Sequence, residues 1–515
     1  MEQTSKHIVN FSRENKKPHM FTALIICAIL MLGLQAIKTT YDNDVWWLLA
    51  TGREIIQNGF PRTNPWAIHD GMQIVIQQWI PSIILYSLYS VGGMPALEIM
   101  LAIQIVALLL LLWKLCRVCA DGKDSIVLIP ILIAFVSLSG YFSARPQIYT
   151  MFLYSLLILV LEKYRKSKNA KILFWLPVIT WIHVNVHASM APFDLFIIFL
   201  YWIPDFLLWI SKRWLLSFSL QNSDYRRKPL LIAGCISAVS MLINPYGIKG
   251  ALYLFESYGA AEYRGYISEM NSLIIYSPYG IADLVLIIIG AIIIGKNGKK
   301  IDLPLTLLFL SSAFLTIMHV RNCWLVALFS LPLIARGLSD LKLPHWNIRF
   351  LHKKAVRLIL AVILTDFMFL YAYSNIWPTL VEYINLSKTD SMDLPQKAAD
   401  WMETYAAENH LQKNEINVFN SFNNGGLLEF RGFKVTMDPR PELWEPCITG
   451  QPEHYYQEFV DFSAGDMDIA EMMDKYTYDF YIVRKDSELE KYMNEHLDKY
   501  EIAEDCNGYK LWKNT

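Results

Sequence analysis

The stretch YDNDVWWLLATGREI, residues 41–55, decides how the chain is organised. It follows a long apolar run, residues 20–37, and it places Asp42 and Asp44 directly beyond that run. After Asp44 the apolar residues recur at helical spacing, which predicts an amphipathic helix over 44–58 that Asp44 is suited to cap. Acids beside a membrane span either cap a solvated helix or take part in chemistry, and this stretch alone leaves both roles open.

The composition is that of a membrane protein. Of the 515 residues, 54% are hydrophobic and 18% are charged, whereas a soluble domain carries about 25% charged residues. The formal net charge of -1 supplies no basic field for the phosphates of a nucleic acid, so we exclude nucleic acid as a partner. Repeated apolar runs long enough to cross a bilayer predict a multi-pass protein of the cell membrane.

The basic connectors set the expected orientation. Lys and Arg concentrate in short loops on the cytoplasmic side of a membrane, so the basic N-terminus is expected in the cytoplasm. The first outer loop, 38–94, carries two helices, 44–58 and 79–91, which are too short or too amphipathic to cross and are expected on the outer surface. About eleven spans are expected, at 20–37, 95–113, 125–142, 147–162, 172–189, 191–210, 229–243, 278–295, 303–318, 322–335 and 356–376.

The chain divides into two parts. Residues 1–376 form the expected transmembrane helical bundle, and 377–515 form a small extracytoplasmic α/β domain. In that domain Gly425-Gly426 marks a turn or a close backbone approach. Helices are expected from about Leu394 and over 487–497, and strands at 416–420, 433–437, 479–483 and 500–504. The fold class is therefore mainly α, with a small C-terminal α/β domain.

Polar side chains gather in the outer turns between the expected spans. Polar groups at membrane depth generally face a cavity or one another, so these turns predict one polar cavity that opens outward. Its candidate lining residues are Arg145, Gln147, His183, Asn185, His187, Asn244, Tyr246, His319, Arg321 and Asn322. The outer domain adds Asp438, Arg440 and Glu442, which either face this cavity or are solvated.

Several of these candidates have a structural interpretation as well. His183 and His187 have the i, i+4 spacing of a shared metal, but the Glu of an H-E-x-x-H motif is missing. Hydrogen-bonded histidines are therefore favoured, and no metal site is predicted. Arg145 and Arg321 either extend to lipid headgroups or bind phosphate. The NPYG motif at 244–247 is also typical of a simple turn.

Several motifs follow one another along nearly the whole chain. They are DNDVWWLLATGREIIQNGFPRTNPWAIHDG (42–71), ARPQIYTMFLYSLLILVLEKYR (144–165), WIHVNVHAS (181–189), INPYG (243–247), VFNSFNNGGLLEF (418–430) and VTMDPRPELW (435–444). Together they resemble a bacterial branch of multi-pass membrane proteins that is similar to the GT-C class of glycosyltransferases. That class includes protein O-mannosyltransferases, aminoarabinose transferases and oligosaccharyltransferase.

The resemblance implies a GT-C type hexosyltransferase that moves a sugar from a polyprenyl-phosphate donor to an acceptor on the outer face. In this class an acid just after the first span deprotonates or positions the acceptor, which implies Asp44, or Asp42, as the catalytic residue. Arg145 and Arg321 would bind the donor phosphate by analogy. Polyprenyl-phosphate-linked sugar and membrane lipids are the implied partners, and a divalent metal is the one cofactor left open.

The first outer loop departs from that branch at three places. Leu48 stands where the branch usually has His, Asn64 replaces an Asp, and Gln77-Gln78 replaces His-Glu. Two other functions stay open beside sugar transfer. The first is a non-catalytic cell-envelope protein whose cavity binds a lipid or glycan. The second is a transporter, although no paired hydrophobic segments suggest inverted repeats.

Overall fold

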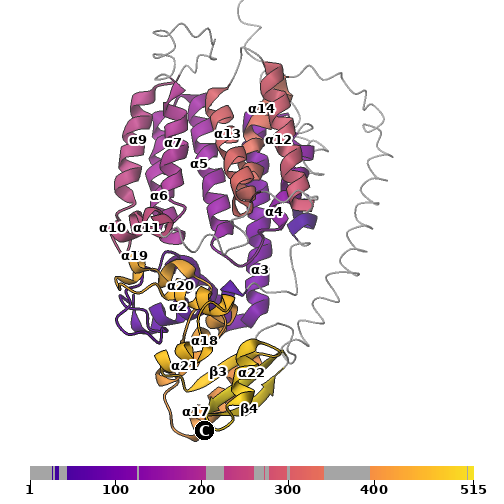
Figure 1. Ribbon diagram of the computed structural model, residues 1–515. Coiled ribbons are helices and arrows are strands. Elements are labelled where there is room, and N and C mark those ends of the chain that lie inside the picture. The colour runs from indigo at the N-terminus through magenta and orange to yellow at the C-terminus, as the bar shows by residue number, and fades with distance from the viewer. Residues whose placement is uncertain are drawn as a thin grey trace, which may run out of the picture.

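The computed structural model describes residues 43–123, 127–204, 225–259, 278–297, 302–340, 395–506 and 508–515, together with 26, 29–33 and 272. Asp42, the expected span 356–376 and most of the expected span 20–37 lie outside these residues. In the view of Figure 1 a bundle of long helices lies at the top, and the α/β part lies at the bottom.

The bundle helices follow the apolar runs of the sequence. They are α4 (Leu128–Ser139), α5 (Gln147–Ser167), η2 (Ala170–Phe174), α6 (Trp175–Val186), α7 (Pro192–Trp202), α9 (Arg227–Ser240), α12 (Pro278–Asn297), α13 (Leu303–Met318), η5 (Val320–Asn322) and α14 (Cys323–Asp340). Three helical segments in the described part of the chain are long and apolar enough to cross a membrane: Trp79–Cys119, Tyr279–Lys296 and Val320–Asp340. The total of about eleven spans stays a prediction.

The expected surface helix 79–91 and the expected span 95–113 are two helical segments that meet at a kink, as the sequence predicted. Both lie within α3 (Trp79–Cys119), whose backbone leaves helical geometry at Gly93, where φ is 61° and ψ is -156°. Glycine adopts this left-handed φ without a steric penalty. Pro95 lacks the N–H that a continuous helix would use. The first turns of α3 therefore pack beside α2 (Asp44–Asn58), and the remainder enters the bundle (Figure 1).

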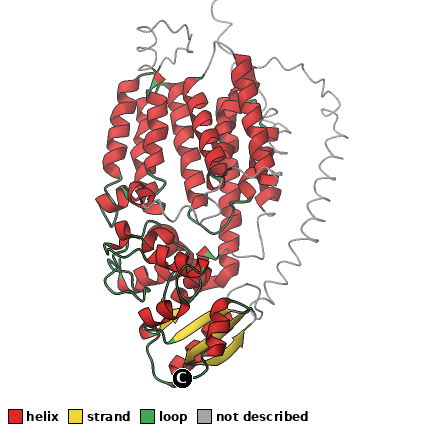
Figure 2. Cartoon of the chain, in the orientation of Figure 1, coloured by secondary structure: helices red, strands yellow, loops and turns green. Residues whose placement is uncertain are grey.

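The α/β part is built on a five-stranded sheet of order β2-β1-β3-β5-β4. Strand β1 (Asn417–Phe419) is parallel to β2 (Lys434–Val435) and to β3 (Phe480–Arg484), and β5 (Tyr509–Asn514) is antiparallel to β3 and β4 (Tyr500–Cys506). Figure 2 shows the strands gathered at the lower end of the molecule. The helices of this α/β part are α17 (Gln396–Glu408), α18 (Gly425–Arg431), α20 (Tyr455–Ala464), α21 (Ile469–Lys475) and α22 (Glu488–Glu495). Short helices complete it: η8 (Lys413–Glu415), η9 (Phe422–Asn424), η10 (Pro441–Trp444) and α19 (Pro446–Thr449).

The segment 43–94, which belongs to the expected first outer loop and keeps that name below, is joined to this sheet of the α/β part, residues 395–515, called the outer domain below. Trp66 O accepts a hydrogen bond from Val435 N at 2.7 Å, and Ile68 N donates to Val435 O at 3.1 Å, so the loop extends the sheet beyond β2. The two parts also share a hydrophobic core, in which Met72 of the loop packs with Trp444 of the outer domain. The helices α10 (Ile248–Ala251) and α11 (Tyr253–Gly259) extend this core toward the bundle.

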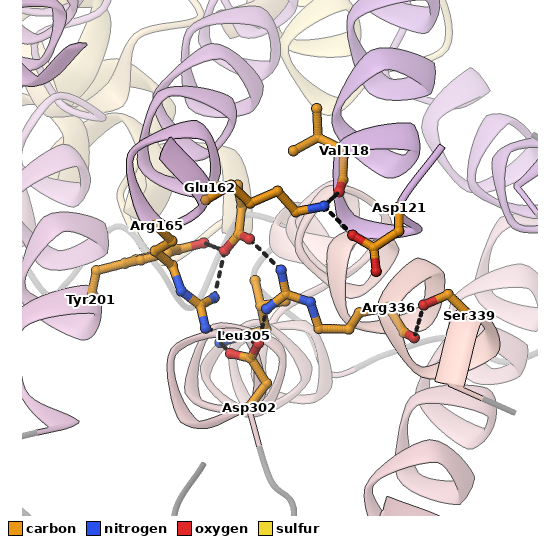
Figure 3. Close-up of polar contacts among 10 residues, drawn as sticks. Val118, Asp121, Glu162, Arg165, Tyr201, Asp302, Leu305, Arg336 and Ser339 are labelled. Atoms are coloured by element: carbon orange, nitrogen blue, oxygen red, sulfur yellow. Dashed lines mark hydrogen bonds and ion pairs between the residues drawn. The ribbon is translucent and has the colours of Figure 1, made fainter. Parts of the chain in front are cut away.

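A buried network of charged side chains connects α5, α13 and α14 at the end of the bundle that lies away from the α/β part. Glu162 of α5 bonds Arg165 at 2.7 Å and Arg336 of α14 at 2.6 Å, and Asp302, which caps α13, pairs with the same two arginines. Tyr201 of α7 donates to Glu162 at 2.9 Å. Figure 3 shows the two carboxylates alternating with the two guanidinium groups. Each buried charge has an opposite partner, which is the condition for such charges to be tolerated.

Candidate functional site

Asp44 and Arg145, two of the predicted site residues, form an ion pair. Arg145 Nη2 lies 3.1 Å from Asp44 Oδ2, and their side chains are 26% and 20% exposed, so the pair is accessible from outside. Helix α2 begins at Asp44 itself with Asn43 at the N-cap position, so Asp44 lies in the first turn rather than at the expected cap. In the first turn a carboxylate is still stabilised by the positive end of the helix dipole.

The outer domain sets the position of α2. Arg53 of α2 donates to the carbonyl oxygens of Phe430 at 2.6 Å and Glu429 at 3.1 Å, at the end of α18. At the start of α18 a Cβ on Gly426 would lie 3.1 Å from Trp47 N, so the backbones approach closely there. The Gly425-Gly426 pair therefore marks a close approach, one of the two alternatives expected, and it begins a helix.

The first turns of α5, which follow Arg145 in the chain, contact two buried histidines. Thr150 Oγ1 lies 2.9 Å from His187 Nδ1 and 3.2 Å from His183 Nε2, and His183 Nδ1 lies 3.0 Å from Asp194 Oδ1. All four side chains are buried. One hydroxyl proton can serve only one of the two rings, so Thr150 donates to one histidine and accepts from the other. The i, i+4 histidines thus share a threonine.

A third polar group joins the loop, the bundle and the outer domain. Glu442 Oε1 accepts from Gln77 Nε2 at 3.4 Å and from Tyr253 Oη at 3.3 Å. Burial raises the pKa of Glu442, and a backbone hydrogen bond and the positive charge of Arg321 oppose that rise. Arg321 lies in η5, between α13 and α14.

Three other candidate residues, Asn185, Asn244 and Tyr246, form hydrogen bonds that stabilise turns and loops. Asn185 accepts from Trp79 Nε1 at 2.9 Å and donates to the carbonyl oxygens of Trp181 and Ile243. Asn244 donates to the carbonyl oxygens of Met241 and Gly247 and accepts from Tyr246 N, which stabilises the NPYG turn. Tyr246 reaches the carbonyl oxygen of Pro61 at 3.1 Å.

The remaining bundle candidates lie at helix ends. His319 and Asn322 lie between α13 and α14, where Asn322 donates to Leu315 O at 3.3 Å. Gln147 is the first residue of α5 and is partly buried.

Asp438 and Arg440 lie in a buried network between the sheet and α2. Arg440 Nη2 bonds Glu429 Oε2 at 2.9 Å and Asp438 Oδ2 at 2.8 Å, and both carboxylates are 0% exposed. The guanidinium also lies 4.7 Å from the centre of the Trp47 ring. Burial raises the pKa of Glu429 well above its usual range, with Arg440 opposing the shift and Asp438 adding to it. These residues hold α2 against the outer domain.

Sequence reasoning did not select Gln77, Thr150 or Glu429 as site residues, although they take part in these groups. Glu442 of the MDPRPELW motif was expected, with Asp438 and Arg440, to be solvated or to face the cavity. Thr150 and Glu429 gave no signal of their own, because their roles depend on helices that meet only in the fold. Across the described ranges no three His, Cys, Asp or Glu side chains group as metal ligands would.

Comparison with known proteins gives matches in structure only. No family model matches the chain, and no curated protein matches its sequence. The crystal structure of the Archaeoglobus fulgidus oligosaccharyltransferase, tethered to an acceptor peptide, matches with a TM-score of 0.54 and 13% identity, over 97% of this chain and 74% of that chain. AglB of the same organism, in complex with an inhibitory peptide and a dolichol-phosphate, matches with a TM-score of 0.53 and 12% identity, over 96% and 74%. The chain therefore has the fold of the GT-C glycosyltransferases.

Proposed function

We propose that this protein is a membrane glycosyltransferase that moves a hexose from a polyprenyl-phosphate donor to an acceptor hydroxyl. The observation that carries the proposal is the ion pair of Asp44 and Arg145, two accessible charges at the end of the bundle next to the α/β part of a GT-C fold. A general base and a cation for the leaving phosphate are the two groups that this transfer needs. One of the similar structures holds a dolichol-phosphate, which supports a lipid-linked donor.

The mechanism assigns one role to each partner. Asp44 takes the proton of the acceptor hydroxyl as its oxygen attacks the anomeric carbon, and the bond from that carbon to the phosphate oxygen breaks on the opposite side. The polyprenyl phosphate leaves with the bonding electron pair, and Arg145 and Arg321 stabilise its charge. A guanidinium has five N–H donors and can hold two anions, as Arg440 does here.

The ion pair also prepares the base. Arg145 beside Asp44 keeps the carboxylate ionised and fixes its direction, since an opposite charge within about 4–6 Å favours the charged form. When a donor phosphate binds Arg145, it competes with Asp44 for the guanidinium. The ion pair between Arg145 and Asp44 then becomes weaker. We place this site on the outer face of the membrane, with about eleven spans, a cytoplasmic N-terminus and an extracytoplasmic C-terminal domain.

The test is transfer from a labelled polyprenyl-phosphate hexose by purified protein in lipid vesicles, with donor cleavage to free hexose as a second readout. Asp44→Asn keeps the shape of the side chain, and we expect it to lower the rate by about 10²–10⁴-fold, the usual contribution of a general base. Glu54→Gln is the matched control, because Glu54 lies on the same helix and bonds only Asn58 in the described contacts. Full activity of Asp44→Asn would show that Asp44 is not the base.

A specific observation favours one alternative, a non-catalytic protein that binds a lipid or glycan in the cell envelope. Leu48, where the related branch has His, is 0% exposed and packs among Trp46, Trp47 and Leu427. That position therefore offers no titratable group. Under this alternative Asp44→Ser leaves function unchanged, and wild-type protein cleaves no labelled donor while still binding it.

A further inference from the structure

A groove lies at the end of the bundle opposite the outer domain, between η2–α6 and α9. It has a volume of about 660 Å³, and its lining includes Leu173, Phe174, Pro177, Ile232 and Ile236. Phe174, Ile232 and Ile236 are 67%, 51% and 52% exposed, so other described residues leave this apolar surface open. The groove belongs to neither the Asp44 site nor the charge network of Figure 3.

Three consecutive bases line the same groove: Arg226, Arg227 and Lys228. They lie at the start of α9, whereas Ile236 lies eight residues further along that helix, about 12 Å at 1.5 Å per residue. The described lining includes no Asp or Glu. One end of the groove is therefore cationic and the remainder is apolar. The cationic end matches the headgroup of a negatively charged lipid, and the apolar remainder matches its acyl chain.

The walls of the groove are held in place. Tyr164 Oη donates to the carbonyl oxygen of Arg226, and the Arg227 guanidinium lies 5.2 Å from the centre of the Tyr225 ring. At the apolar end Ser240 Oγ donates to the carbonyl oxygen of Pro177 at 3.1 Å and joins α9 to α6. Contacts between different helices therefore fix both ends of the groove, and its shape is set by the fold.

We propose that this groove binds one anionic glycerophospholipid, with its phosphate at Arg226 and Lys228 and an acyl chain along Ile232 and Ile236. Basic pockets between membrane helices on the cytoplasmic side are known to hold anionic lipid headgroups. Clustered bases attract any anionic surface, whereas a groove can select a single lipid molecule. The site is independent of sugar transfer, since it lies at the opposite end of the bundle.

The test uses full-length protein in nanodiscs of equal parts phosphatidylglycerol and phosphatidylcholine, transferred to mild detergent. Native mass spectrometry then counts retained lipid. We expect wild-type protein to retain one phosphatidylglycerol in preference to phosphatidylcholine, and the double variant Arg226→Gln, Lys228→Gln to retain at least tenfold less. The matched control, Arg117→Gln with Lys296→Gln, removes an exposed Arg and Lys outside this groove and should retain lipid as wild type does.

A second variant separates a groove from general charge attraction. Ala170→Trp fills the groove from an exposed position and keeps every charge, and we expect it to lose the lipid as well. The proposal is wrong if wild-type protein retains both lipids equally, if the control loses lipid as much as the double variant, or if inorganic phosphate displaces the bound species. It is also wrong if wild-type protein retains none, as when another part of the chain covers the groove. Equal melting temperatures of all variants will show that each one folds.

Discussion

Replacing Arg440 by Met should destabilise the outer half of the protein severely. The change removes the cation that bonds Glu429 at 2.9 Å and Asp438 at 2.8 Å, and it leaves two carboxylates that are 0% exposed. Breaking a buried ion pair costs about 3–5 kcal/mol, because the remaining charge is buried without a partner. Loss of the guanidinium from the Trp47 ring adds about 0.5–2 kcal/mol.

The total, about 3.5–7 kcal/mol, corresponds to a lower melting temperature by about 7–28 °C for a folding unit of 150–250 residues. Intrinsic tryptophan fluorescence can follow the transition, since Trp47 and Trp66 both lie against Arg440. The effect should be larger at pH 8 than at pH 5. Burial already raises the pKa of Glu429, and protonation at low pH removes the charge that Arg440 no longer balances.

A triple variant tests the reasoning. Arg440→Met combined with Glu429→Gln and Asp438→Asn removes all three charges and keeps the side-chain volumes similar. We expect it to recover most of the lost stability, since a neutral buried group costs less than an unpaired charge. If the single variant melts within 2 °C of wild type, or if the triple variant is as unstable as the single one, the network does not hold α2 to the outer domain as we argue.

Three further predictions concern His69, Gly425 and Arg145. Burial, with a contribution from Lys475, lowers the pKa of His69 to about 4. His69 therefore stabilises the fold above its unfolded pKa, and this contribution is lost as the pH falls from about 6.5 to 4. His69→Phe, which keeps the 4.0 Å stack on Tyr455, should melt with a flatter pH dependence in that range. Gly425→Ala should lower the melting temperature by about 5–15 °C, because its Cβ would lie 2.0 Å from Met437 O; a change within 2 °C would contradict this. In the transfer assay Arg145→Lys should keep more activity than Arg145→Gln, and equal activities would exclude a role for its charge.

The sequence predicted the elements of the bundle well, because apolar runs of membrane length have few alternatives. It separated 79–91 from 95–113, and the structure confirms a break there, since Gly93 takes a non-helical conformation between the two helical segments of α3. The strand β5 was missed, although Asn507-Gly508 before it is a strong hairpin signal. Lys510 and Lys513 masked its alternation.

The site was predicted as a set of residues, and its pairing was not. Asp44 and Arg145 were both selected, but sequence offered no reason to pair them, because α2 and α5 meet only through the tertiary fold. Asp438 and Arg440 were selected as solvated or facing the cavity. Their actual partner, Glu429, comes from α18, and no periodicity in the sequence reveals such a contact.

The contact between the first outer loop and the outer domain also affects when the loop can fold during synthesis of the chain. Arg53 and its acceptor Phe430 are 377 residues apart in the chain. Ribosomes add about 5–20 residues per second, so the loop waits roughly 20–75 s for its partner to be made. During that interval Trp66, Met72 and Ile74 of the loop lack the core that buries them. We expect biogenesis to depend on a chaperone that shields this loop until the outer domain has been made.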